Sequence, residues 1–268
     1  MKYVILGPKN KVIDKIVNPT QADLDRYFDL IKSRSDEKLG NEWLNIVTKS
    51  GKRTGNIKLR DLIHKEGDWH YELSLFTYSV ENGVPYIHLQ LRDKNKAINP
   101  RYIDATVGGH VGVFENLDDV VIRETKEEIG LDLNRNKLKY FGKGQTIEKG
   151  NDYQNRSVRP TYVCEVSNDL DQYKLEDGEA AGILKIKIDD FIKLLTGEKD
   201  KIKDIDIKLI TDKNYINTQI ALSHDQVSSQ RHEFLLKSAA ITNYLAKGGE
   251  VGTDAYKKPV EFYMEMGR

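Results

Sequence analysis

The clearest pattern along the chain is an alternation of apolar and polar side chains over residues 86–92, with the apolar side chains at the odd positions. This period of two predicts a strand with one apolar face. Residues 69–80 also have the composition of a strand. Asn82-Gly83 lies between the two segments, and this dipeptide readily adopts the positive φ angles of a tight turn. We therefore predict a β-hairpin from residue 69 to residue 92.

Other segments have the spacing of apolar residues that is typical of helices. Two of them follow capping-box sequences, which begin at Thr20 and Ser223. A third follows Asp189, and a fourth ends at Gly130, a residue type suited to the end of a helix. These signals predict helices near residues 24–31, 117–129, 191–195 and 227–245.

Short apolar runs predict further strands at residues 3–6, 43–47, from 56 onward, 138–142, 161–166 and 183–188. The turn-forming residues 50–52 make a hairpin of the second and third of these. Residues 143–160 have the composition of a polar loop, which contains Glu148, Arg156 and Arg159. Residues 205–222 are predicted to be irregular, with one strand at its start. Strands and helices together predict an α/β protein.

Composition narrows the functional classes. The chain has 268 residues, with 42 basic and 42 acidic side chains and therefore no net charge. A dedicated nucleic-acid-binding protein normally has an excess of basic residues, and this chain has none. One cysteine excludes an internal disulfide and fits a reducing cytoplasm. The apolar run at the start is too short for a signal peptide, and no run reaches the length of a membrane span.

The predicted helix over residues 117–129 carries an unusual stripe. Its core-facing side begins with Leu117, Val120 and Val121, and then continues into Glu124, Glu127 and Glu128. Like charges three or four residues apart destabilise a helix by about 0.2–0.5 kcal/mol per pair, and burial increases this cost. A divalent cation with a preference for oxygen ligands, above all Mg²⁺, removes the conflict. The alternative is a solvated acidic face neutralised by Arg123 and Lys126.

The wider spacing favours the metal. Gly109, Glu115, Arg123-Glu124, Glu127-Glu128 and Gly130-Leu131 occur at the fixed spacings of a long motif. This motif, residues 109–131, resembles the Nudix box, the signature of the Nudix hydrolases. Thr125 departs from it, since the family usually has an aliphatic residue there.

The resemblance implies a fold, an ion and a chemistry. Nudix domains are α/β/α sandwiches around a mixed sheet, and they cleave a diphosphate linked to another group. By this likeness Glu124, Glu127 and Glu128 are metal ligands, together with the carbonyl of Gly109. The ion is expected to be Mg²⁺, with Mn²⁺ as the alternative.

The resemblance also assigns catalytic roles. Glu127 and Glu124 are expected to be catalytic as well as metal-binding, and Arg123 with Glu115 is expected to orient the carboxylates. The family commonly has a further glutamate downstream of the box. Glu179 is the first candidate for it, followed by Glu148 and Glu165.

Substrate contacts are expected from the strand that precedes the box. Gln90 and Arg92 lie on its polar face, with a solvent-facing role as the alternative. Gly108 is a third expected contact, because a missing side chain lets a ligand approach the backbone. Lys94, Lys96 and Arg101 in the next loop either meet phosphates or keep the loop soluble, and the second interpretation is favoured.

Part of the chain, residues 69–110, is similar to the branch of the family that is related to isopentenyl-diphosphate isomerase. The isomerase's catalytic cysteine would fall on Gly108, and its absence disfavours isomerisation, whereas the complete box favours hydrolysis. His64 and His70 suggest a second metal site, but their spacing fits no familiar ligand pair. We therefore favour packing at the end of a strand for these two histidines.

Together these features predict an Mg²⁺-dependent Nudix hydrolase that acts on a nucleoside diphosphate derivative or a related metabolite. The alternatives are a non-catalytic Nudix domain that senses a nucleotide and, less favoured, an isomerase-like enzyme. We expect an N-terminal helical extension (1–40), a Nudix domain (41–200) and a C-terminal helical extension (201–268). The expected partner is a small-molecule diphosphate, without nucleic acid or membrane. A homodimer is left open, and the expected location is the cytoplasm.

Overall fold

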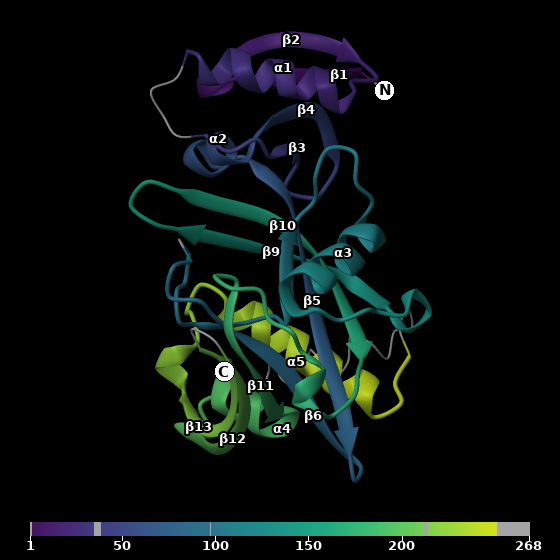
Figure 1. The fold of residues 1–268 in the computed structure, drawn as a ribbon, viewed down its shortest axis with the longest axis vertical. Coiled ribbons are helices and arrows are strands. Elements are labelled where there is room, and N and C mark those ends of the chain that lie inside the picture. Colours follow the sequence, from purple (N-terminus) through teal and green to yellow (C-terminus); the bar gives the residue numbers. More distant parts are fainter. Residues whose placement is uncertain (1, 35–38, 97, 212–213, 251–268) are drawn as a thin grey trace. The chain divides into compact units, whose positions relative to one another are not determined.

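The computed structural model describes residues 2–34, 39–96, 98–211 and 214–250. The chain is an α/β protein, as predicted (Figure 1). It divides into two compact units, each made of three stretches of chain. The first unit comprises residues 1–73, 110–117 and 144–159, and the second comprises residues 74–109, 118–143 and 160–268.

The helices are α1 (Gln21–Lys32), α2 (Arg60–Glu66), α3 (Leu117–Ile129), α4 (Ile188–Leu195) and α5 (His232–Ala246). The strands are β1 (Lys2–Leu6), β2 (Val12–Val17), β3 (Trp43–Val47), β4 (Arg53–Leu59), β5 (Trp69–Glu81), β6 (Val84–Arg92), β7 (Ile103–Asp104), β8 (Val107–His110), β9 (Lys139–Lys149), β10 (Gln154–Glu165), β11 (Ala180–Lys187), β12 (Lys201–Ile210) and β13 (Tyr215–Ser223).

A four-stranded sheet in the order β2-β1-β4-β3 builds much of the first unit. β1 runs parallel to β4, whereas the other neighbours are antiparallel. α1 begins at Thr20, whose side chain and that of Asp23 form the predicted capping box. Its buried residues Leu24, Tyr27 and Ile31 join the core of this sheet. The predicted extension 1–40 thus supplies two strands and one helix to the first unit.

A larger sheet has nine strands, in the order β13-β12-β11-β6-β5-β10-β9, with β7 beside β6 and β8 beside β5. The predicted hairpin of β5 and β6 is confirmed. It turns at Asn82 and Gly83, which have φ angles of 50° and 78°. In the second unit, α4 and α5 pack on each other and on strands of this sheet, and their apolar residues form one core with it.

The C-terminal segment corrects one expectation. Residues 205–222 are not irregular, because β12 and β13 form a long antiparallel pair there. The register of this pair shifts between Ile202 and Ile205, and Asp204 has a positive φ angle of 55°. β13 is exposed over most of its length, so its sequence lacks the apolar alternation that predicts a strand. The helix predicted at the end of the chain is confirmed as α5, while the capping box at Ser223 caps a short 3-10 helix (His224–Gln226) before it.

The predicted polar loop over residues 143–160 is also wrong. Most of this segment belongs to β9 and β10, which turn where the amide of Gly150 donates to the Tyr153 carbonyl. Glu148 and Arg159 are 0% and 2% exposed. Polar side chains pointing into a buried network hide the apolar alternation on which strand prediction depends.

The first unit buries a lysine at its centre. Lys58 on β4 is fully buried, and its Nζ lies 2.9 Å from a Glu66 carboxylate oxygen. The same ammonium contacts Asp68 and the side-chain oxygen of Asn10. This ion pair network connects the strand with the end of α2 and the segment after it.

We expect Lys58→Met to lower the free energy of unfolding by about 3 kcal/mol, because removing one partner leaves half-buried carboxylates without their cation. Chemical denaturation measures the change, with Lys52→Met as the matched control because Lys52 is exposed. A loss in Lys58→Met no larger than the loss in the control would contradict a role of this network in stability.

Candidate active site

The box helix is α3, and its buried residues are Val120, Val121, Thr125, Glu128 and Ile129. Thr125, which departs from the family pattern, is fully buried. Its hydroxyl donates to the Val121 carbonyl at 2.6 Å, so the polar atom is satisfied inside the helix. A threonine can therefore replace the usual aliphatic residue. The helix ends at Gly130, whose φ angle is 70°.

The three box glutamates have different surroundings within the second unit. Glu128 is buried, whereas the side chains of Glu124 and Glu127 are 16% and 58% exposed. Arg123 connects Glu124 and Glu127, since its Nη1 lies 3.1 Å from a Glu124 oxygen and 2.8 Å from a Glu127 oxygen. The predicted single stripe thus separates into a buried carboxylate, a half-buried one and one at the surface.

The glycine pair on β8 lies directly against two of these carboxylates. A Cβ atom on Gly109 would lie 2.4 Å from the Cδ atom of Glu124, which no real Cβ tolerates. The amide of Gly108 donates to Glu128 at 3.4 Å. Glycine at position 109 therefore lets the Glu124 carboxylate pack against the backbone of the strand.

Glu179 adds a fourth carboxylate to the group. It lies just before β11, and its carboxylate pairs with Lys96. Burial, and then the charges of Glu179 and Glu124, raise the pKa of Glu128 well above its ordinary value of 4.5. Lys96 and the Gly108 amide act in the opposite direction but do not outweigh these causes. Burial and the neighbouring acids therefore both favour the protonated carboxyl of Glu128.

These residues fit a hard divalent cation. Glu124, Glu128 and Glu179 offer carboxylate oxygens, the ligand type that Mg²⁺ and Mn²⁺ prefer. The crowding of like charges, one of them buried, is the arrangement that a bound cation relieves. The carboxylate of Glu127 points to the surface, where its described partner is Arg123.

Comparison with known proteins bears on this arrangement. The model of the NUDIX domain matches residues 82–205, which include the whole box. An uncharacterised Nudix hydrolase of Clostridium acetobutylicum is 27% identical over 168 residues, which cover 60% of this chain and 77% of that protein. By this match, residues 82–205 form a NUDIX domain.

Two further proteins are similar to parts of this chain. Nudix hydrolase 3 of Arabidopsis thaliana is 21% identical over 76% of this chain, but the match spans only 28% of the Arabidopsis protein. A solved structure from Deinococcus radiodurans is 15% identical and covers 59% of this chain and 91% of its own, with a TM-score of 0.45. The domain and the Nudix hydrolase relatives indicate a pyrophosphohydrolase. In the described part of the chain, no helix is long and apolar enough to cross a membrane.

Two of the residues expected to contact the substrate, Gln90 and Arg92, lie on β6. Gln90 is 4% exposed, so the polar face of the strand is buried rather than open to solvent. The Nε of Arg92 donates to the Ile98 carbonyl at 3.0 Å, and its Nη1 lies 3.3 Å from Asp104. Asp104 also accepts from Arg231 at 2.6 Å. Arg92 thus holds the loop after β6, and a direct contact between Arg92 and substrate stays a prediction.

The remaining acidic candidates are separated by the structure. Glu165 is exposed at the end of β10, and Glu148 is buried in the first unit beside Arg159. Glu179 alone among the three is a described cause of the raised Glu128 pKa. Glu115, the expected partner of Arg123, belongs to the first unit and accepts from the Gly112 amide at 2.8 Å.

The sequence interpretation missed a group of residues in the first unit. His64 and His70, interpreted as strand-end packing, lie close to Glu72 and His110. Gly67, between the two histidines in the sequence, is the feature that could have predicted their proximity. Gly67 ends α2 with a φ angle of 71° and turns the chain back into β5. A histidine before and one after such a reversal can meet, although six residues separate them.

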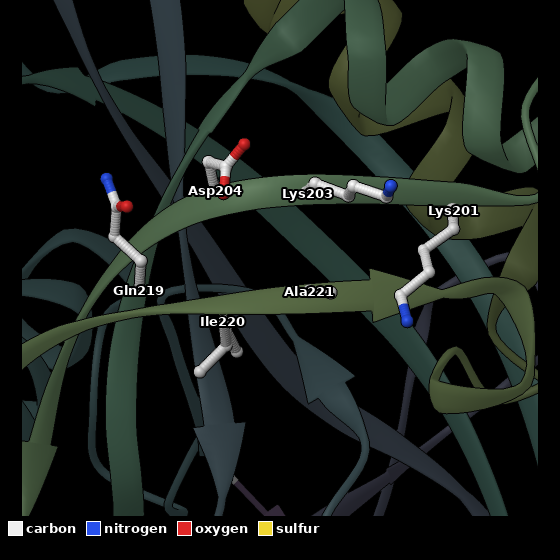
Figure 2. A pocket seen from close by; sticks show the side chains of 6 residues that line it. All are labelled: Lys201, Lys203, Asp204, Gln219, Ile220 and Ala221. Carbon is white, nitrogen blue, oxygen red and sulfur yellow. The ribbon is translucent and has the colours of Figure 1, made fainter.

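A surface hollow of about 290 Å³ lies over β12 and β13 (Figure 2). It is lined by Lys201, Lys203, Asp204, Gln219, Ile220 and Ala221. The hollow coincides with the register shift of this strand pair, and no box residue lines it. It is therefore not part of the Nudix candidate site.

We expect Glu128→Gln to change how the stability of the metal-free protein depends on pH. The folded state raises the pKa of Glu128 above the ordinary 4.5, so it favours the protonated carboxyl. This contribution is fully present below pH 4.5 and is lost as the pH rises through the raised value. Glutamine is neutral throughout, so the variant should gain stability over the wild type as the pH rises towards 8.

Thermal melts in the presence of a chelator between pH 4 and pH 8 measure this difference. Glu165→Gln is the control, because Glu165 is exposed. If the difference in melting temperature between wild type and Glu128→Gln stays constant from pH 4 to pH 8, ionisation of Glu128 does not destabilise the fold.

Proposed function

We propose that this protein is an Mg²⁺-dependent Nudix hydrolase that cleaves the diphosphate linkage of a nucleoside diphosphate derivative or a related metabolite. One observation carries the proposal. Glu128 is buried within the field of Glu179 and Glu124, beside the backbone of Gly108 and Gly109. Such crowding is unfavourable without a cation, and a substrate diphosphate needs a cation for its own charge.

The box residues and Glu179 are assigned separate roles in metal binding and proton transfer. Glu124, Glu127 and Glu128 with the Gly109 carbonyl would hold the ion, with Mn²⁺ as the alternative. A bound ion supplies charge neutralisation for the phosphate oxygens during attack at phosphorus. Glu179 and Glu127 are the candidates for the base that takes the proton from the attacking water, because both carboxylates are partly open to solvent.

Basic residues position these acids. Arg123 lies between Glu124 and Glu127 and can hold both carboxylates in place while the ion and substrate come and go. Lys96 pairs with Glu179 and is half-buried, so it can exchange this partner for a phosphate oxygen when a diphosphate enters. Gly108 and Gly109 leave the backbone accessible to the ligand.

The proposed substrate is a class of compound, the diphosphate-containing metabolites. Gln90, Arg92 and Gly108 remain the proposed contacts to the group carried by the diphosphate. The single cysteine supports a cytoplasmic protein, and a homodimer stays open. Isomerisation is disfavoured, because Gly108 has no side chain that could transfer a proton.

The alternative of a different class is a Nudix domain that binds a nucleotide without cleaving it. The full set of box acids argues against this alternative, because a sensor needs no carboxylate that takes a proton from an attacking water. Measuring both nucleotide binding and turnover distinguishes a hydrolase from a sensor.

We expect purified protein with Mg²⁺ to hydrolyse at least one member of a panel of nucleoside di- and triphosphates, nucleotide sugars, dinucleotides and isoprenyl diphosphates. Glu128→Gln should abolish turnover, because a neutral amide is a poor ligand for Mg²⁺. Released phosphate or nucleotide measures the reaction, and Glu165→Gln is the control. Metal-dependent binding without turnover would favour the sensor, and wild-type turnover in Glu128→Gln would remove the ligand assignment.

Gly109→Ala tests the contact between the strand and the helix. The added Cβ would displace the Glu124 carboxylate, so we expect turnover to fall by about 10- to 100-fold with little loss of stability. The control is Gly40→Ala, whose Cβ would meet its nearest neighbour at an ordinary 3.5 Å. Equal rates in the two variants would mean that the position of Glu124 is unimportant for the reaction.

A further inference from the structure

Three histidines and one glutamate gather in the first unit, whereas the glutamates of α3 belong to the second. They are His64 on α2, His70 and Glu72 on β5, and His110 at the end of β8. One donor atom from each side chain lies within 4.8 Å of all the others. His70 is fully buried, and the side chains of Glu72 and His110 are 10% and 13% exposed.

Local structure brings these four side chains together. Gly67 ends α2 and reverses the chain, which returns His70 towards the last turn of the helix, where His64 lies. Glu72 is two residues after His70, so both point to the same face of β5. β8 pairs with β5, and the amide of Val111 donates to the Tyr71 carbonyl at 3.2 Å, which fixes His110 beside them.

The distances match a small coordination sphere. The Nε2 atoms of His64 and His70 are 3.4 Å apart. The Nε2 of His110 lies 3.2 Å from an oxygen of Glu72. A tetrahedral ion with bonds of about 2.0–2.1 Å holds its ligand atoms about 3.3–3.4 Å apart. Two edges of the tetrahedron are therefore already formed, and the rest need a contraction of about 1.4 Å or less.

Groups around the cluster orient the histidine nitrogens. Nδ1 of His70 donates to the Asp68 carbonyl at 3.1 Å, and Nδ1 of His110 faces Glu42 at 3.6 Å. The hydrogen bond to Asp68 keeps the proton of His70 on Nδ1 and leaves the lone pair on its Nε2, which faces His64 in the cluster. The Nε2 of His110 is buried and makes no hydrogen bond, although Glu72 is close, so this atom lacks the partner that buried polar atoms normally have.

Hydrogen bonds also fix the position of the Glu72 carboxylate. Arg159 donates to its Oε2, and Asn155 donates to its two oxygens at 3.2 and 3.1 Å. Arg159 also faces Glu148 at 3.8 Å, so one guanidinium serves two buried carboxylates. This network keeps Glu72 ionised and fixes its Oε1 beside His110.

We propose that His64, His70, Glu72 and His110 form a closed site for one divalent transition-metal ion, with Zn²⁺ as the ion that fits best. Three imidazole nitrogens and one carboxylate suit Zn²⁺ and disfavour Mg²⁺, which requires oxygen ligands. Four protein ligands leave no open position, as in structural zinc sites. The ion would tie α2, β5 and β8 together. This proposal does not depend on the proposed hydrolase activity.

Metal binding to tag-free protein tests the proposal. The protein is stripped with a chelator, dialysed into buffer with excess Mg²⁺ to saturate oxygen-ligand sites, and titrated with Zn²⁺. We expect about one Zn²⁺ per chain, measured by elemental analysis and by competition with a chromogenic chelator. Co²⁺ in place of Zn²⁺ should give the strong visible absorption of tetrahedral cobalt. A protein that binds no Zn²⁺ under these conditions would overturn the proposal.

Variants assign the ligands. His64→Gln, His70→Gln and His110→Gln should each weaken Zn²⁺ binding by at least about 100-fold. His64 is half-buried in the last turn of α2, so His64→Gln should fold even if His70→Gln does not. The matched control is His224→Gln, an exposed histidine of the second unit. Glu128→Gln should also keep the site. Unchanged Zn²⁺ affinity in a folded His64→Gln, or equal losses in His224→Gln, would refute the assignment.

Discussion

The arrangement of the box site depends on one electrostatic conflict, the burial of the Glu128 carboxylate among other acids. Glu124 and Glu179 both act on it, and the low polarity around a buried side chain makes this repulsion stronger than at the surface. The fold sustains the conflict because α3 is anchored by apolar residues on either side of Glu128 in the chain and stops at Gly130. Stability is thus given up at the point where a cation and a diphosphate are expected to bind.

The two groups of ligands in this chain differ in a way that follows ordinary coordination chemistry. The box offers flexible, partly exposed carboxylates with Lys96 and Arg123 nearby, an arrangement from which ion and substrate can exchange. Two histidines of the cluster are neutral imidazoles, since burial lowers the pKa of His64 to about 4 and that of His70 to about 3. Neutral nitrogens held by a rigid surrounding suit an ion that stays bound.

Sequence patterns predicted those parts of the structure whose signals are local. The hairpin at Asn82-Gly83, the capping box at Thr20 and the box helix are all of this kind, and all are present. Wrong predictions came where side chains serve a distant partner. Glu148 and Arg159 make β9 and β10 look like a loop, because their burial depends on Asn155 and Glu72 rather than on the residues next to them. The burial of Gln90 and the pairing of Lys96 with Glu179 likewise depend on strands far apart in the sequence.

The path of the chain through its two units has a consequence for experiments on fragments. Each unit combines three separate stretches, and the box itself changes unit after Gly109 and again after Leu117. No single cut can therefore separate the two units, because any fragment that contains all of one unit also contains part of the other. A single proteolytic cut between residues 73 and 160 should leave at least one unit divided between two fragments. A truncation to the matched domain, residues 82–205, would remove strands from both sheets. The whole chain, rather than its matched domain, is the unit to express, label and unfold.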